Sequence, residues 1–539
     1  MGFKQKRILA LLFSILGVFF LLHFATQQIE KKLHTAINSK IVVLNNSTPY
    51  VITKEHIDIS IFKRSFFLQD VLILPDSLES DPNAIQPHLS VSRIEGLQFE
   101  ILPLLLNNKL RLGKIEVNGV EVVQRDKRNP TLARGAMNSP KKNKNKWLKE
   151  IGIDSILIKD FVFATLNNKL NDTLFKVTGK SLTFSNILFE KLQKENQLFF
   201  NSPNLVVTAN TIESGSSHAQ FSLSTLQLNF KQKSISVSDF KYGHSDSLKI
   251  KTDQQLYSTP VNFIHLPTLH GFGIVTDTLL YSKKLLADSL VITNAQIASM
   301  KNTNKPWNKE KVIPLPQKML RQITPRIGLN NLVIKNATVD YTEIHERKEV
   351  GIPMDQLNVE IKNFGGTSTS FTNEEKSMHI ALQGRLFKDF SFYINLDYLD
   401  PMRYDGFEFK GNTGPFNFET FNPIMVPTSN IKFESGHVSR IDFNGSGNGE
   451  ETTGEFVMVY NNLTATVLKE NGYKKNKTFS WLANTAVRKQ NPKNGKLKTA
   501  QMHYQRVPYK GFGNYMFKTI ESGLINSVYP FGKRKTYTD

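Results

Sequence analysis

Two clusters of polar side chains in this 539-residue chain have residue types that could bind zinc. His265 and His270 offer two imidazoles, but no cluster of carboxylates accompanies them and Pro267 lies between them. A zinc site needs three or four converging ligands. Glu343, His345 and Glu346 also lie together, but they lack the second histidine of a zinc-protease helix. Neither cluster predicts a metal site.

Nucleophilic chemistry has one candidate, Ser139-Pro-Lys-Lys142, in which a serine precedes a lysine by three positions. This spacing occurs in serine enzymes that use lysine, but only together with partner motifs that this chain lacks. It also contains no nucleophile elbow, phosphate-binding loop or dinucleotide fingerprint after a suitable strand. We therefore predict no catalytic residue, no metal site and no cofactor, and an enzyme is the weakest functional class.

The body of the chain instead carries a short repeated unit. In each copy apolar residues alternate, an Asn or Asp interrupts, and an apolar residue returns five positions after the second one. The copies are Ile115–Val122, Ile156–Phe163, Leu290–Ile297 and Leu332–Val339. Side chains of a strand alternate between faces, so an odd spacing would move the second apolar set to the opposite face. A turn or bulge at the Asn or Asp would restore a shared face.

Each unit is therefore predicted to form two short strands with one apolar face. Asn118-Gly119 is the clearest case, because Asn-Gly between alternating apolar residues is typical of a two-residue hairpin. A larger duplication encloses two units, since residues 151–160 match residues 327–336 in character. Further strands are expected after each copy, near Leu182–Phe184 and Leu357–Val359. Repetition on this scale indicates stacked β-units.

Composition supports a mainly β chain without disulfide bonds. The chain has 38 Phe, 3 Trp and no Cys, and β-branched residues are dense. Most of the net charge of +21 lies in residues 126–150 and 469–539 and in the first seven residues, so the rest is balanced. No aromatic-interleaved basic motif suggests nucleic acid. The basic segments fit either solvated loops or attraction to anionic lipid.

An N-terminal membrane anchor is predicted. Lys4, Lys6 and Arg7 precede an apolar stretch over residues 8–26, close to the roughly 20 residues that span a bilayer. A cleaved signal peptide is the alternative, but Ala25 has His23 rather than a small residue two positions before it. The flanking charges favour a cytoplasmic N-terminus, with the bulk of the chain outside the cytoplasm. The residues taken to represent this anchor are Ile8, Leu12, Leu16, Phe20 and Phe24.

The C-terminal third has a different pattern. Strands are expected over Ile431–Phe443 and Phe456–Val467 around the glycine-rich turn Asn444–Gly449, followed by a helix over Phe479–Arg488. A second helix would gather its apolar residues on one face, which we expect to dock on the protein itself rather than on lipid. That face consists of Tyr515, Met516, Ile520, Gly523, Leu524 and Val528.

The sequence resembles the AsmA-like family of bacterial envelope proteins. The resemblance lies mainly in a C-terminal signature and also in the repeated units and the N-terminal anchor. The signature comprises Phe421–Ile424, Ile431–Val438, Gly454–Leu463, Ala483-Asn484 and Asn491-Pro492. This resemblance implies a single-pass inner-membrane protein with a periplasmic body, a curved β-groove and a part in outer-membrane biogenesis or lipid transport. The chain is shorter than the largest members, which bridge two membranes.

The fold expected on these grounds is mainly β: a transmembrane helix, then an elongated, curved, repeated β-groove with a few short helices, notably at the C-terminus. The expected segments are a cytoplasmic tip and anchor (1–26), a first β-groove segment (27–126), a basic loop and short helix (127–150), a second β segment (151–300), a second basic loop and short helix (301–326), a third β segment with the signature (327–468) and a basic, partly helical cap (469–539).

Phospholipid acyl chains are the expected occupants of the groove. The candidate residues are Ile115, Val117, Ile156, Ile158, Phe163, Ile292, Ile297, Leu332, Ile334 and Val339. The alternative is that this apolar face packs against a second sheet in ordinary sandwiches, which have the same periodicity. A structural or scaffolding envelope protein with a protein partner at the C-terminal cap is then the competing function.

Overall fold

The computed structural model describes residues 26–28, 30–31, 34–35, 37–39, 41–46, 50–75, 88–100, 103, 106–126, 149–167, 173–191, 198–200, 202–215, 220–243, 247–276, 278, 284–323, 326–346, 348–365, 377–468 and 488–529. Ile8, Leu12, Leu16, Phe20 and Phe24 of the expected anchor lie outside these residues, as do residues 127–148 of the expected basic loop and short helix and most of the expected helix over Phe479–Arg488. Within the described part of the chain, no helix has the length and apolar character needed to cross a membrane.

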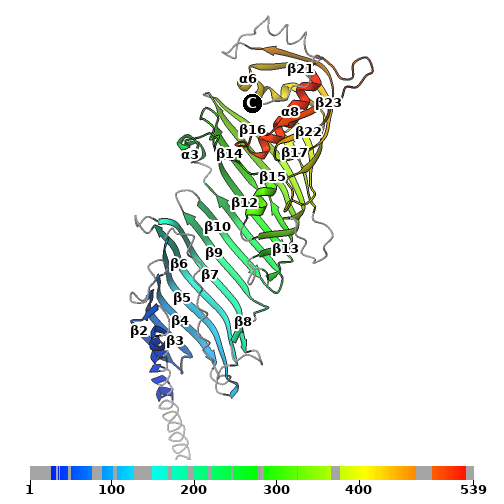
Figure 1. Ribbon diagram of the computed structural model, residues 1–539. Coiled ribbons are helices and arrows are strands. Elements are labelled where there is room, and N and C mark those ends of the chain that lie inside the picture. The colour runs from blue at the N-terminus through cyan, green and yellow to red at the C-terminus, as the bar shows by residue number, and fades with distance from the viewer. Residues whose placement is uncertain are drawn as a thin grey trace, which may run out of the picture. The chain divides into compact units, whose positions relative to one another are not determined.

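The described chain is mainly β, as predicted, and divides into two compact units, residues 1–231 and 232–539. Each unit contains a curved, mixed sheet of long strands (Figure 1). In both, most neighbouring strands are antiparallel, and one junction near the middle of the sheet is parallel.

The first unit contains the strands β1 (Tyr50–Thr53), β2 (His56–Ser60), β3 (Ser65–Pro75), β4 (His88–Glu100), β5 (Lys109–Asp126), β6 (Glu150–Asn167), β7 (Thr173–Lys191), β8 (Leu198–Phe200), β9 (Val206–Gly215) and β10 (Gln220–Asn229). Both β1 and β2 pair with β3, and the sheet continues through β4, β5, β6, β7, β9 and β10, with β8 also beside β7. The parallel junction joins β5 to β6.

The second unit contains the strands β11 (Ser234–Tyr242), β12 (Val261–Phe272), β13 (Lys284–Thr293), β14 (Gln296–Asn302), β15 (Arg326–His345), β16 (Lys348–Phe364), β17 (Met378–Leu386), β18 (Phe390–Tyr398), β19 (Phe407–Thr413), β20 (Phe416–Asn417), β21 (Ile431–Gly447), β22 (Glu451–Val467) and β23 (Ala500–Gln505). These strands pair largely in sequence order, and the parallel junction joins β13 and β14 to β15. Its helices are α3 (Leu248–Gln254), α5 (Pro316–Gln322), α6 (Asn422–Ser429), α8 (Phe512–Val528) and the 3-10 helix η2 (Phe418–Phe421).

The predicted duplication is confirmed by the topology. Residues 151–160 and 327–336 both open the second strand of a parallel pair, β6 in one unit and β15 in the other. The expected following strands over Leu182–Phe184 and Leu357–Val359 are parts of β7 and β16, which pair antiparallel with β6 and β15. The repeated sequence therefore encodes the same three-strand arrangement twice.

The predicted hairpin at Asn118-Gly119 is wrong. Strand β5 runs without interruption from Lys109 to Asp126, because hydrogen bonds to β4 on one side and β6 on the other keep it extended. Within β5 only Gly119 is left-handed, with a φ of 62°. Asp160, at the facing position of β6, has a φ of 50°. A single left-handed residue thus replaces the expected turn.

Two of the other repeated units are likewise single strands rather than pairs of short ones. The units Ile156–Phe163 and Leu332–Val339 lie wholly within β6 and β15. Only Leu290–Ile297 is divided, between β13 and β14, with Asn294 at a φ of 56° in the break. In each unit one Asn, Asp or Gly takes the left-handed backbone conformation.

Three smaller expectations are corrected at the ends of elements. Glu150, expected at the end of the basic loop and short helix, is the first residue of β6, because Lys109 of β5 pairs with it. The glycine-rich stretch is mostly strand, since β21 extends to Gly447 and leaves only residues 448–450 as the turn. Arg488, the one described residue of the expected helix, is not helical.

Candidate functional site

Lateral pairing aligns the apolar residues of the first unit in rows that cross the sheet. Residues paired directly across neighbouring strands share a face, so a row describes one surface. One row consists of Phe66, Gly96, Ile115, Ile156, Phe184, Val207 and Leu228. The next consists of Leu68, Ile94, Val117, Ile158, Leu182, Ala209 and Leu226. A third, beyond the left-handed residues, contains Ile73, Leu89, Val122, Phe163 and Val177.

The second unit has the same organisation around its own parallel junction. Its longest row contains Val237, Leu269, Ile292, Ile334, Val359, Leu382 and Ile394. A second contains Leu290, Leu332, Ile361, Ile380 and Leu396, and a third contains Ile264, Ile297, Val339 and Met354. All ten candidate residues from the sequence therefore fall in these rows, five in each unit.

The two halves of a repeated unit share one face, as predicted. Ile334 and Val339 lie five positions apart in β15, and both pack on one cluster with Ala337 and Leu357. Asn336, at a φ of 53°, lies between them. An uninterrupted strand would have placed Ile334 and Val339 on opposite faces, so the left-handed residue produces the continuous apolar surface.

The exposure of the candidates separates a partly exposed face from a closed core. All ten candidate side chains are partly buried, and none is fully buried. The longest row of the second unit continues beyond Ile394 through Gly411 to Phe443, Phe456 and Ala500, which are only 6%, 0% and 2% exposed. The same surface is thus half open over β13 and β15, where Ile292 and Ile334 lie, and closed over β21, β22 and β23, where Phe443, Phe456 and Ala500 lie.

Helix α8 closes that second part. Tyr515 and Gly523 are buried, and Met516, Ile520, Leu524 and Val528 pack on the cluster that contains Phe456 and Met502. The fit is close at Gly523, where an added Cβ would lie 2.7 Å from side-chain atoms of Met502 and Phe456. The sequence-predicted helical face is confirmed, and it docks on the protein's own sheet.

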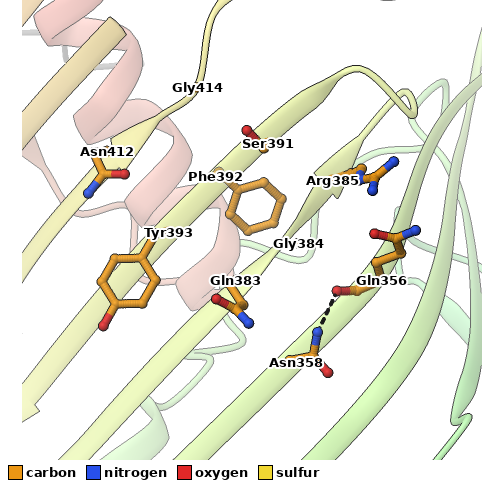
Figure 2. Close-up of a pocket in the computed structure, with 10 residues that line it drawn as sticks. All are labelled: Gln356, Asn358, Gln383, Gly384, Arg385, Ser391, Phe392, Tyr393, Asn412 and Gly414. Atoms are coloured by element: carbon orange, nitrogen blue, oxygen red, sulfur yellow. Dashed lines mark hydrogen bonds between the residues drawn. The ribbon is translucent and has the colours of Figure 1, made fainter.

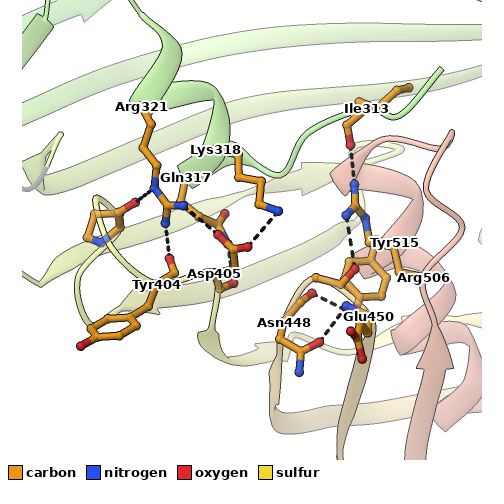
Figure 3. Close-up of polar contacts among 12 residues, drawn as sticks. Ile313, Gln317, Lys318, Arg321, Tyr404, Asp405, Asn448, Glu450, Arg506 and Tyr515 are labelled. Atoms are coloured by element: carbon orange, nitrogen blue, oxygen red, sulfur yellow. Dashed lines mark hydrogen bonds and ion pairs between the residues drawn. The ribbon is translucent and has the colours of Figure 1, made fainter.

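The crossover between β14 and β15 meets the same closed core. Leu315 is fully buried in the cluster beneath α8, and Arg506 donates to the carbonyl oxygen of Ile313 (Figure 3). The following helix, α5, is tied to the β18–β19 loop by Asp405, which pairs with Lys318 at 2.9 Å and Arg321 at 3.0 Å. Partial burial opposes ionisation of Asp405, but these two cations outweigh it and hold its pKa below the usual range.

The opposite face of the first sheet is charged. Glu116 of β5 pairs with Lys114 and with Lys159 of β6, and hydrogen bonds from these lysines lower the pKa of Glu116. Glu150 pairs in the same manner with Lys109 and Arg111. The sheet is therefore amphipathic, with the ion pairs on the side away from the apolar rows.

A shallow polar pocket of about 310 Å³ lies in the second unit (Figure 2). Asn358, Gln383, Tyr393 and Asn412 occupy one lateral row across β16 to β19. They alternate along their strands with the apolar Val359, Leu382 and Ile394, and so belong to the other side of the sheet. This pocket offers amide, phenol and guanidinium groups, and no nucleophile paired with a base.

The polar clusters that opened the sequence analysis have structural partners. His265 lies 2.8 Å from Asp239. Glu343 accepts a hydrogen bond from Tyr341, and His345 lies 3.3 Å from Thr303. Among the residues that the structure describes, no group of three or more His, Asp or Glu side chains could hold a metal ion.

The sequence reasoning missed many residues of the apolar rows. Leu182 and Phe184 on β7, and Val359 and Leu382 on β16 and β17, extend the rows on the far side of each repeated unit. Their alternating apolar pattern was visible in the sequence, but only the register of the strands shows that they align with the candidates.

Comparison with known proteins adds no identification, because no family model matches the sequence and no curated protein is similar to it. The resemblance to AsmA-like proteins therefore stays an expectation from the sequence motifs.

Proposed function

We propose that the half-open apolar faces of the two units bind the acyl chains of phospholipids, and that the chain contributes to lipid transport between membranes or to outer-membrane biogenesis. In this proposal it is an AsmA-like protein anchored in the inner membrane by residues 8–26, with its body in the periplasm. The ten candidate residues line the acyl-chain surface, and no catalytic step is involved.

The observation that carries the proposal is the difference in exposure along one row of side chains. Ile292 and Ile334 remain partly exposed, whereas Phe443 and Phe456 in the same row are buried in the core cluster on which α8 packs. Soluble proteins rarely leave a large contiguous apolar surface in water, and such surfaces mark binding sites. Rows of Ile, Leu, Val and Phe without a charged side chain suit hydrocarbon better than a polar ligand.

A phospholipid transfer assay with paired variants tests the proposal. The variant Ile158→Asp/Ile334→Asp places two carboxylates on the apolar rows. Burying a charge against hydrocarbon costs several kcal/mol, so we expect transfer of labelled phospholipid between vesicles to fall at least about tenfold. Lipid recovered with the purified chain should fall in parallel, as measured by mass spectrometry.

The matched control is Leu157→Asp/Val333→Asp. These residues directly precede Ile158 and Ile334, are also apolar and partly buried, and face the other side of the sheet. The control should retain transfer. If wild-type protein transfers no faster than protein-free vesicles, or if both double variants behave alike, the proposal fails.

A scaffolding role is the second candidate, and the closed core around α8 favours it. The outer side of α8 carries Phe517, which is 61% exposed, next to Lys518. A protein partner at this cap would protect that side of the helix. Photo-crosslinking from position 517 in membranes should then yield one defined protein adduct, and adducts with lipid alone would count against this role.

A further inference from the structure

A basic turn projects from the second unit beside the end of α8. It comprises residues 488–498, and its centre is Lys493-Asn-Gly-Lys496. The backbone N–H of each of these lysines donates to the other's carbonyl oxygen, at 3.2 and 3.1 Å. Asn494 and Gly495 have φ values of 52° and 73°, as a type I′ turn requires. The turn thus holds two lysines at its end.

The base of this turn is fixed to the sheet. Asn491 is fully buried, and its side-chain nitrogen donates to the carbonyl oxygens of Met458 and Lys498 at 2.8 and 3.0 Å. Burial raises the pKa of Tyr460 to about 12, so its hydroxyl keeps its proton and donates to the carbonyl oxygen of Arg488 at 2.7 Å. Little conformational entropy remains to be lost if the turn binds a partner.

The C-terminal end of helix α8 is hydrogen-bonded to the base of this turn. The Nζ of Lys498 donates to the carbonyl oxygens of Asn526 and Tyr529 at 2.6 and 3.0 Å, which satisfies groups at the helix C-terminus. The N–H of Arg488 donates to the carbonyl oxygen of Val528 at 2.8 Å. These hydrogen bonds hold Tyr529 beside the turn.

Exposed cations and exposed apolar side chains lie together here. Lys489, Lys493 and Lys496 are exposed cations, and within the part of the chain that the structure describes no ion pair neutralises them. Leu497 and Tyr529 are 49% and 44% exposed. Residues 488–520 contain eight Lys and Arg and no Asp or Glu, so the local charge is uncompensated along the chain.

We propose that Lys489, Lys493, Lys496, Leu497 and Tyr529, which we name the tip, dock on an anionic membrane surface. The lysines would contact lipid phosphates, and the two exposed apolar side chains would enter the interfacial layer. This inference goes beyond acyl-chain binding by the sheets, because it assigns a separate surface for contact with a bilayer.

The mixture of side chains favours a membrane over other acidic partners. Tyrosine and leucine beside lysine are typical of surfaces that lie at the headgroup level. Nucleic-acid sites would be expected to add arginine forks or a stack of aromatic rings, and the tip has a single ring and no arginine. Lysine, a compact point charge, suits lipid phosphates without requiring one fixed geometry.

The test is vesicle capture by the full chain, immobilised on beads through a tag at its N-terminus. Fluorescent vesicles containing phosphatidylglycerol should be captured more strongly than vesicles of phosphatidylcholine alone. Raising the salt from about 0.1 M to about 1 M, which shortens the screening length from ~10 to ~3 Å, should abolish the difference. Capture of both vesicle types to the same extent would overturn the proposal.

Variants locate the contact. Each lysine near an anionic surface contributes about fivefold to binding, so Lys493→Gln/Lys496→Gln should weaken capture by about 30-fold. The control Lys335→Gln/Lys348→Gln removes two exposed lysines from β15 and β16 and should have no effect. Leu497→Ser/Tyr529→Ser should weaken capture also at high salt. Equal capture by the tip variant and the control would refute docking through the tip.

Failure of this proposal is distinguishable from failure of acyl-chain binding. The variant Ile158→Asp/Ile334→Asp leaves the tip intact, so it should capture anionic vesicles normally while losing lipid transfer. The tip variant should still retain co-purified lipid.

Discussion

Asn294, in the break between β13 and β14, lies beside Asn336 of β15, and the Nδ2 of Asn336 donates to the Oδ1 of Asn294 at 2.8 Å. Both residues are in the left-handed region, at φ values of 56° and 53°. Asparagine tolerates this conformation better than most residues with a side chain. The phase therefore changes between β13 and β14 at the same level as it changes within β15, so that the apolar rows continue on one face.

Substitution at Asn336 should show that the left-handed backbone matters more than the amide. Asn336→Val combines loss of the hydrogen bond with β-branched strain, so we expect about 2 kcal/mol of destabilisation. Asn336→Gly loses only the hydrogen bond and should cost about 1 kcal/mol or less. Urea unfolding of both variants measures the difference.

The control for this comparison is Asn331→Val, in the extended part of β15, which should cost little. Equal destabilisation by Val and Gly at position 336 would contradict a role for the backbone conformation.

The docking of α8 predicts an asymmetry between two glycines of that helix. Gly523→Ala should destabilise the protein by roughly 1–3 kcal/mol, because its Cβ would collide with Met502 and Phe456. Gly513→Ala, in the first turn of α8, should be neutral or slightly stabilising, since no atom lies within 4 Å of the added Cβ. Thermal unfolding measures both, and a harmless Gly523→Ala would mean that α8 does not pack as described.

The ion pairs of Asp405 predict a pH dependence for α5. A carboxylate whose pKa is lowered in the folded state stabilises that state above its unfolded pKa of about 4, and the contribution is lost as the pH falls through the folded pKa. At neutral pH, Asp405→Asn should speed amide hydrogen exchange in α5 by about fivefold, equivalent to about 1 kcal/mol. Wild type and variant should converge only once the pH falls below the lowered folded-state pKa of Asp405. A difference that persists unchanged in acid would exclude this role.

The sequence predicted the strand content, the duplicated units and the face of α8, because these depend on local periodicity. Alternation identified Ile158 and Ile334 as strand residues, and the odd spacing to Phe163 and Val339 required a break at the Asp or Asn. The backbone conformation at the break does not follow from this spacing. Asn-Gly suits both a hairpin and a single left-handed residue. At Asn118-Gly119, the pairing of β5 with β4 and β6 along both edges keeps the strand continuous, so Gly119 is a single left-handed residue.

Long-range relations could not be derived from the sequence. The parallel pairing of β5 with β6 joins segments that are more than 20 residues apart in the sequence, and no local pattern indicates its direction. Closure of the row at Phe456 depends on α8, which follows more than 50 residues later. The same alternating pattern therefore gave no means to tell the open part of the face from the closed core. The turn Lys493–Lys496 contains Asn-Gly, which is typical of a two-residue turn, but the sequence analysis did not predict it.

The most direct test of acyl-chain binding is site-specific photo-crosslinking in cells, with a photoreactive phenylalanine analogue at four single positions. Ile158 and Ile334 lie in the apolar rows, and Leu157 and Val333 directly precede them on the other face. The account predicts phospholipid adducts, identified by mass spectrometry, from positions 158 and 334 and none from 157 and 333. Equal adducts at all four positions, or none at 158 and 334, would contradict it.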